Sequence, residues 1–110
     1  MYIIRATYRP KDNMYFDKEY YLTHHIPLAK KLLSGRVDYV QMHVEFDSCV
    51  MMQANEARSP AVFVLLVRST RDVDNFNAFR SSCQVEPLRD DIKNYTNCDP
   101  EWTVAEVVMS

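Results

Sequence analysis

The sequence has very little glycine: Gly35 is the only one in 110 residues. Loops that hold nucleotide phosphates, such as the P-loop and the dinucleotide-binding turn, need several glycines because the backbone must approach the phosphate closely. A single glycine therefore excludes both of these nucleotide-binding motifs. Gly35 follows Ser34 after a helix-forming segment, and we expect it to end that helix in the left-handed conformation.

Cysteine is also scarce, and its spacing carries no motif. The three cysteines are Cys49, Cys83 and Cys98, an odd number without a C-x-x-C pair. Reduced thiols are the simplest interpretation of this pattern. Cys83 lies on the apolar face of an expected helix, which predicts a core residue rather than a nucleophile.

The histidines are not arranged as metal ligands. His24 and His25 are adjacent and diverge on a helix, and His43 is isolated. No compact set of histidine, cysteine or carboxylate side chains appears along the chain. We therefore expect neither a metal nor a cofactor.

The chain lacks a strong charge of one sign and a long apolar run. Its formal net charge is −2, with acids and bases mixed, and without a basic stripe or tail we expect no nucleic-acid partner. The longest apolar run, residues 60–67, is far too short to span a membrane. The chain opens directly into a strand-like segment rather than a leader, so we expect a cytoplasmic protein.

Four strands and two main helices are predicted within a single domain spanning residues 1–110. Strands are expected at residues 2–9, 36–46, 61–68 and 102–109, one helix between Asp17 and Gly35, a second capped by Thr70 or Asp72, and a short one from Pro87 through Ile92. Residues 47–59 are polar and irregular, and are expected to form a long loop. The order β-α-β-β-α-β predicts a ferredoxin-like α+β fold, with helices on one face of a four-stranded antiparallel sheet.

The segment 61–68 is apolar at successive positions, which predicts that both of its faces are buried. Helices can cover one face of the sheet, and the simplest cover for the other is the sheet of a second copy. Because a domain of this size buries a limited core alone, we expect a homodimer that forms through the sheet faces.

His25 is the best functional landmark. On an uninterrupted helix it shares a stripe with Tyr21, Leu28 and Leu32, which points it inward and His24 outward. Pro27 has no N–H for the preceding turn, so we expect the helix to kink or break beside the imidazole and to expose backbone groups to a ligand. Two interpretations stay open: a functional histidine at an internal pocket, and a buried histidine that only satisfies its hydrogen bonds.

Two segments resemble a known family. Phe16-Asp17 followed by Tyr20-Tyr21-x-x-x-His25-x-Pro27-Leu28 looks like the signature of the EthD family, of the dimeric α/β-barrel superfamily. The segment 91–96, followed by Pro100 and a closing strand, is similar to the second characteristic stretch of that family. The two segments lie near opposite ends of the chain, so the resemblance covers essentially all of it.

The resemblance implies two sheets packed face to face and a pocket in each subunit between sheet and helices. The family is named for an association with ethyl tert-butyl ether degradation, and the superfamily includes lactone isomerases, polyketide cyclases, decarboxylases and haem-degrading monooxygenases. Binding of haem is suggested only by this analogy with the superfamily. The resemblance carries over His25 as the motif residue, with Asp91 and Asn94 as weaker candidates.

The enzymatic interpretation assigns His25 as general acid or base, with Asp91 orienting the imidazole. Tyr8 or Tyr21 would donate a hydrogen bond to a developing enolate oxygen. An apolar wall would come from Phe63, Phe76 and Trp102. This set suits cofactor-free isomerisation, cyclisation or decarboxylation of a small carbonyl or aromatic metabolite.

Purely structural interpretations of these residues also remain open. Asp91 is also interpreted as a solvated acid or local cap, and Asn94 as a residue that organises the following turn. The alternative function is a non-catalytic binding or accessory protein that holds a small apolar or aromatic ligand for a partner enzyme of a degradation pathway.

Overall fold

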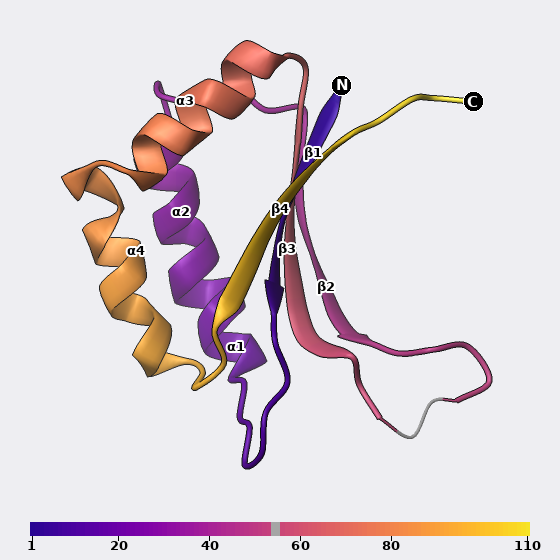
Figure 1. The fold of residues 1–110 in the computed structure, drawn as a ribbon. Helices are drawn as coiled ribbons and strands as arrows, with labels where there is room; N and C mark the ends of the chain where they lie inside the picture. The colour runs from indigo at the N-terminus through magenta and orange to yellow at the C-terminus, as the bar shows by residue number, and fades with distance from the viewer. Residues whose placement is uncertain (54–55) are drawn as a thin grey trace.

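One antiparallel sheet forms the base of the molecule. The computed structural model describes residues 1–53 and 56–110. The strands lie in the order β2-β3-β1-β4, with the bounds β1 (Tyr2–Tyr8), β2 (Gln41–Ser48), β3 (Ser59–Val67) and β4 (Pro100–Glu106). Figure 1 shows every labelled helix on the same side of this sheet. The predicted ferredoxin-like α+β fold is therefore confirmed.

The helical layer has two stretches, the second of which is interrupted at Ser81 and Ser82. The first stretch comprises α1 (Lys18–Tyr20), the π-helical segment η1 (Tyr21–His25) and α2 (Ile26–Leu33). The second stretch comprises α3 (Thr70–Arg80), the short turn η2 (Cys83–Val85), α4 (Glu86–Asp91) and η3 (Ile92–Asn94). Among the described residues, no helix is both long and apolar enough to cross a membrane.

The ends of the first helical stretch follow the sequence closely. The Asp17 side chain accepts a hydrogen bond from the Tyr20 backbone N–H, as expected of an N-cap. The stretch ends at Leu33, and Gly35 adopts a φ of 77°, the left-handed conformation that a glycine reaches without strain.

The helix does not break at Pro27, although a separate α-helical segment, α2, begins at Ile26 with the proline in its first turn. The chain stays helical there, because a π-helical turn precedes the proline and Ile26 donates its N–H to the carbonyl of Tyr21. The wider turn changes the inward face: Ile26, Ala29 and Leu33 are buried, with Tyr21 and His25 before them. The expected continuation of the stripe through Leu28 and Leu32 is therefore wrong, and both lie only half-buried.

Strand pairing, rather than local alternation, sets the strand bounds. The second strand begins at Gln41 instead of residue 36, because residues 34–37 still bond back to the end of α2. The fourth strand runs over Pro100–Glu106 instead of 102–109, since its partner β1 ends at Tyr2 and Tyr8. The expected loop at 47–59 is shorter than predicted, with Ser48 and Ser59 paired in the sheet, and its residues 54 and 55 lie outside the described residues.

Two expectations for α3 need correction. Its N-cap is Ser69, whose side chain and Asp72 form a reciprocal capping box; Thr70 is the first helical residue. The helix ends at Arg80, so Cys83 falls in the turn that follows and is exposed rather than in the core. The short helix expected at Pro87 is present as α4.

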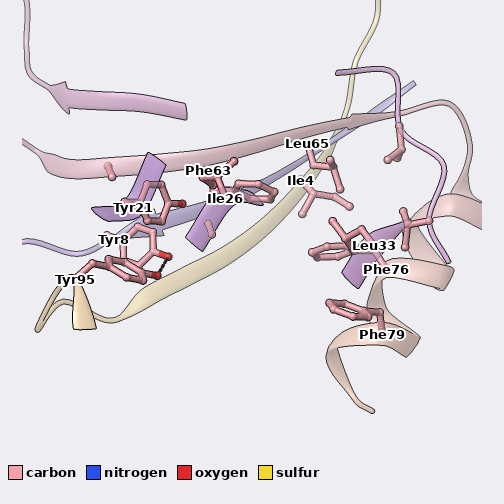
Figure 2. Packing of buried hydrophobic residues seen from close by; sticks show 14 of the residues in the cluster. Ile4, Tyr8, Tyr21, Ile26, Leu33, Phe63, Leu65, Phe76, Phe79 and Tyr95 are labelled. Carbon is pink, nitrogen blue, oxygen red and sulfur yellow. Dashed lines mark hydrogen bonds between the residues drawn. The ribbon is translucent and has the colours of Figure 1, made fainter. Parts of the chain in front are cut away.

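The third strand is buried on both faces, as its apolar run predicts. Phe63 and Leu65 belong to the hydrophobic core between the sheet and the helices. Figure 2 shows part of this core. On the opposite face Val64 is 0 % exposed in the single chain. Its cross-strand neighbours Arg5 and His43 flank it, so this burial does not require a second copy.

Candidate functional site

A cavity of about 330 Å³ lies between the sheet and the helices. Most of the side chains that line it are apolar, which suits a small organic ligand. Five of the predicted site residues line it: Tyr8, Tyr21, His25, Phe63 and Trp102. Phe76, the third residue of the predicted apolar wall, lines the cavity as well. Asp91 and Asn94 do not line the cavity.

The imidazole of His25 meets the carboxylate of Asp91. His25 is buried at 7 % exposure, at the end of η1. Its Nδ1 lies 2.9 Å from Oδ2 of Asp91, the last residue of α4. This polar contact joins the two helical stretches beside the cavity.

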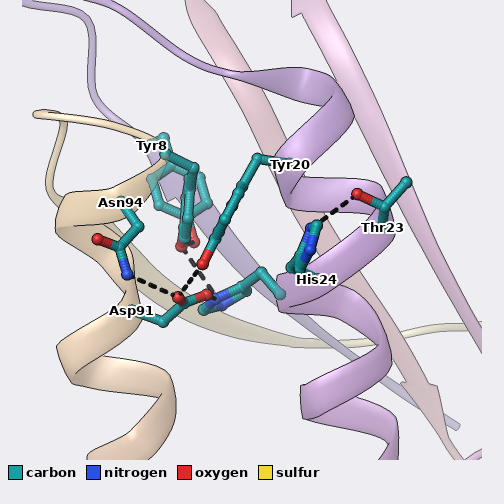
Figure 3. A network of polar contacts seen from close by, with 8 residues as sticks. Tyr8, Tyr20, Thr23, His24, Asp91 and Asn94 are labelled. Carbon is teal, nitrogen blue, oxygen red and sulfur yellow. Dashed lines mark hydrogen bonds and ion pairs between the residues drawn. The ribbon is translucent and has the colours of Figure 1, made fainter.

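Asp91 is fixed by two further donors, which Figure 3 shows around it. The Tyr20 hydroxyl donates to Oδ1 at 2.6 Å, and Asn94 Nδ2 donates to the same oxygen at 3.0 Å. The Asp91 side chain is only 11 % exposed. The interpretation of Asp91 as a solvated acid is therefore wrong, and Asn94 supports the carboxylate.

The charge state of this pair follows from burial and hydrogen bonding. Burial alone would raise the pKa of Asp91, but the hydrogen bonds from Tyr20, Asn94 and His25 outweigh it and lower the pKa below its usual value. Burial lowers the pKa of His25 and outweighs the opposing effect of Asp91. At neutral pH the carboxylate is ionised and the imidazole neutral, so Nδ1–H donates to Asp91 and Nε2 keeps a lone pair.

The Nε2 side of His25 faces two tyrosines. The Tyr95 hydroxyl lies 3.3 Å from Nε2 and 2.6 Å from the Tyr8 hydroxyl; Figure 2 shows the contact between the two tyrosines. Burial raises the pKa of both tyrosines, so both keep their protons. With Nε2 as an acceptor, Tyr95 donates to His25 and accepts from Tyr8, which lines the cavity.

Tyr20 and Tyr95 lie at the site, although the sequence analysis did not name either as a site residue. Tyr20 falls on the outward helical row with His24, and its ring stacks on the His24 ring at a centroid distance of 4.6 Å. Tyr95 belongs to the second family-like segment and is fully buried. The one feature of the sequence that could have indicated Tyr95 as a site residue is its position directly after Asn94, a predicted site residue.

The arginines Arg80 and Arg89 also line the cavity and were not predicted. The guanidinium of Arg80 lies 4.4 Å from the ring centre of Trp102. Arg89 donates from Nη2 to the backbone carbonyl of Arg80 at 3.3 Å. No sequence pattern indicated either contact, because both depend on how α3, α4 and β4 pack.

A metal site is not formed by the part of the chain that the structure describes. Its histidine, cysteine and acidic side chains do not gather in any group of three or more. The donors around His25 instead form a linear chain of tyrosine, imidazole and carboxylate groups.

In sequence, the chain matches no protein-family model and no curated protein. In structure, it is similar to an EthD-like protein from Ralstonia eutropha JMP134, with 24 % identity, a TM-score of 0.80, and coverage of 98 % of this chain and 92 % of that chain. It is also similar to an ethyl tert-butyl ether (EthD) family protein from Bacillus halodurans C-125, with 16 % identity, a TM-score of 0.64, and coverage of 98 % and 99 %.

A third similar structure is HapK from Hahella chejuensis, with 19 % identity, a TM-score of 0.60, and coverage of 100 % of this chain and 95 % of that chain. At such identities a likeness concerns the fold, and chemistry has to be argued from the site itself. The resemblance to the EthD family is thereby confirmed at the level of the fold: this chain has the fold of the EthD-like proteins.

Proposed function

We propose that this protein transfers a proton on a small carbonyl or aromatic compound without a cofactor, in an isomerisation, cyclisation or decarboxylation. The observation that carries the proposal is the position of His25. One imidazole nitrogen bonds to an ionised carboxylate, the other bonds to a tyrosine pair, and the ring lines an apolar cavity. This is the arrangement expected of a neutral general base.

The proton path in this proposal runs through Tyr8 and Tyr95. The Tyr8 oxygen takes a proton from the ligand while its own proton passes to Tyr95, and the Tyr95 proton passes to Nε2 of His25. Both tyrosines remain neutral and the imidazole becomes a cation, which the Asp91 carboxylate stabilises. Reversing the path returns the proton to another atom of the ligand.

The cavity restricts the ligand by size and polarity. Its volume of about 330 Å³ fits a compound of one or two rings. Aromatic side chains supply one wall, with ring centroids of Phe63 and Phe76 at 6.2 Å and 5.4 Å from that of Trp102. A small apolar or aromatic ligand is therefore the class that the cavity fits.

Deuterium exchange tests the proposal without knowledge of the natural substrate. The probe is 2-tetralone, a two-ring ketone whose α-protons exchange with D₂O by base catalysis, and the measurement is proton NMR. We expect the wild-type protein to accelerate the exchange and His25→Gln to lose about 10²-fold or more of it.

His24→Gln is the matched control, because His24 is the exposed neighbour of His25. Its exchange rate should equal that of the wild type. Circular dichroism melting shows that each variant is folded. A folded His25→Gln protein that exchanges 2-tetralone as fast as the wild type contradicts the assigned role.

A second candidate is a non-catalytic protein that holds a ligand for a partner. One observation favours it: every buried side-chain nitrogen and oxygen of the described residues already has a hydrogen-bond partner. A satisfied histidine of this kind is also a structural element. Binding of 2-tetralone without any accelerated exchange in the wild type would support this alternative.

We also propose a homodimer through the sheet face opposite the helices. Figure 1 shows that face without a covering helix, and Val62, Val64 and Leu66 form its apolar centre. Leu66→Glu should convert a dimer to a monomer in light scattering, whereas Leu22→Glu, at an exposed helical position, should not. A wild-type protein with the mass of one chain at micromolar concentration contradicts the dimer.

A further inference from the structure

We propose that the cavity takes a ligand with a carboxylate group, held by Arg80, while the reactive end of the ligand lies at His25 and Tyr8. This inference deepens the proposed function and rests on it. It comes from two cationic side chains that line a mostly apolar cavity.

Arg80 is half-buried. Among the residues that the structure describes, no carboxylate lies within ion-pair distance of its guanidinium. Burial, with the nearby charge of Arg89, lowers the pKa of Arg80. Because a guanidinium remains charged in proteins at neutral pH, an unbalanced positive charge faces the cavity.

The position of Arg80 is fixed by an aromatic ring rather than by an acid. The guanidinium lies over Trp102, a cation–π contact that leaves its in-plane N–H groups free to bind an anion. Arg80 and Trp102 also border a second, smaller cavity of about 100 Å³. The arginine therefore borders both cavities.

Arg89 adds a second positive charge at the same end. It is exposed at the rim and bonds through one nitrogen to the backbone carbonyl of Arg80. That contact brings two cations together at the C-terminal end of α3. A carboxylate placed between them relieves their repulsion and accepts charge-assisted hydrogen bonds.

Asp99 gives the ligand its orientation. It is the acidic residue that lines the cavity, and it precedes Pro100, which pairs with Tyr8 in the sheet. Trp102 lies two residues farther along β4, about 7 Å away by strand geometry. A carboxylate is disfavoured at the Tyr8 end by Asp99 and favoured at the Trp102 end by Arg80.

The charge preference is measured by calorimetric titration of two probes of equal shape. 2-Naphthoate carries the carboxylate, and 2-naphthamide replaces it with a neutral amide. At pH 7.5 and low salt, we expect the wild type to bind 2-naphthoate at least tenfold more tightly than 2-naphthamide. Arg80→Gln should abolish this preference, so that its affinities for the two probes become equal.

Three further variants separate charge from structure. Arg80→Lys keeps the charge and should keep part of the preference, and Arg89→Gln, at an exposed rim position, should reduce it. Arg71→Gln changes an exposed arginine of the same helix outside the cavity and should have no effect. A preference that survives in Arg80→Gln overturns the inference.

The result also distinguishes this inference from the proposed function. Equal affinity of the wild type for both probes overturns the carboxylate preference. The role of His25 is then still tested by the deuterium-exchange assay. In His25→Gln the preference for 2-naphthoate should persist, because the imidazole is not its source. Failure of the wild type to bind either probe overturns both proposals.

Discussion

Nδ1 of His25 and Oδ2 of Asp91 lie 2.9 Å apart, although the two residues are separated by 66 positions in the chain. The contact joins the first helical stretch to the second and fixes the imidazole in one tautomer. Because this contact controls the charge state of the imidazole, the first prediction concerns the protonation of His25.

The stability of the protein should fall as the pH is lowered below 6.5. Burial lowers the pKa of His25 in the folded state, so between that pKa and 6.5 the unfolded chain binds a proton that the folded chain does not. The free energy of unfolding therefore rises with pH across this window. Urea denaturation at several pH values measures it.

His25→Gln is the control for this pH dependence, since it removes the titrating group. Its unfolding free energy should change less between pH 5 and pH 7 than that of the wild type. The wild type should also lose unfolding free energy as the pH falls below 3.8, because the pKa of Asp91 is lowered in the folded state. Equal pH profiles above pH 5 for the two proteins would contradict the neutral buried imidazole.

Asp91→Asn should weaken both the site and the fold. The amide cannot stabilise an imidazolium, and we expect 2-tetralone exchange to slow by about 10-fold to 100-fold, part of what a general base contributes. The lost charge-assisted hydrogen bonds should cost about 2 kcal/mol in the free energy of unfolding. The exposed neighbour provides the control, Asp90→Asn, with a change within about 0.5 kcal/mol.

Tyr95→Phe should interrupt the proton path while preserving the cavity. It leaves the Tyr8 hydroxyl and Nε2 of His25 without their partner, which should cost about 1–3 kcal/mol of stability. Exchange should slow while the affinity for 2-naphthoate stays unchanged. Tyr15→Phe, which removes an exposed hydroxyl, should leave the exchange rate at the wild-type value.

Ala29→Leu should fill the cavity without touching the polar groups. Ala29 is buried in α2 and lines the cavity, so the larger side chain competes with a ligand for the same space. We expect 2-naphthoate affinity to fall at least tenfold and stability to change by less than about 1.5 kcal/mol. Ala78→Leu on the exposed side of α3 should bind 2-naphthoate as the wild type does.

The sequence was sufficient for the order of the elements and for the direction of His25. Periodicity shows which side chains share a face, so it placed His25 inward and His24 outward correctly. Local capping chemistry likewise identified Asp17, because its hydrogen bond lies within one turn. Pro27 misled the same reasoning, since a π-helical turn accommodates it without a break.

The contacts that complete the site could not be read from one sequence. Asp91 reaches His25 only because α4 packs beside the first helical stretch, and Arg80 reaches Trp102 only because α3 lies over β4. Spacing along one element contains no information on which element it will meet. For the same reason Cys83, placed by helical phase, was assigned to the core when the helix in fact ends before it.

The π-helical turn has a consequence for how this chain acquires its chemistry. Consecutive residues of an α-helix diverge by roughly 100°, yet His25 and Ile26 both line the cavity because the wider turn holds one surplus residue. The surplus residue thus lets a polar imidazole and an apolar side chain that are neighbours in the chain share one cavity.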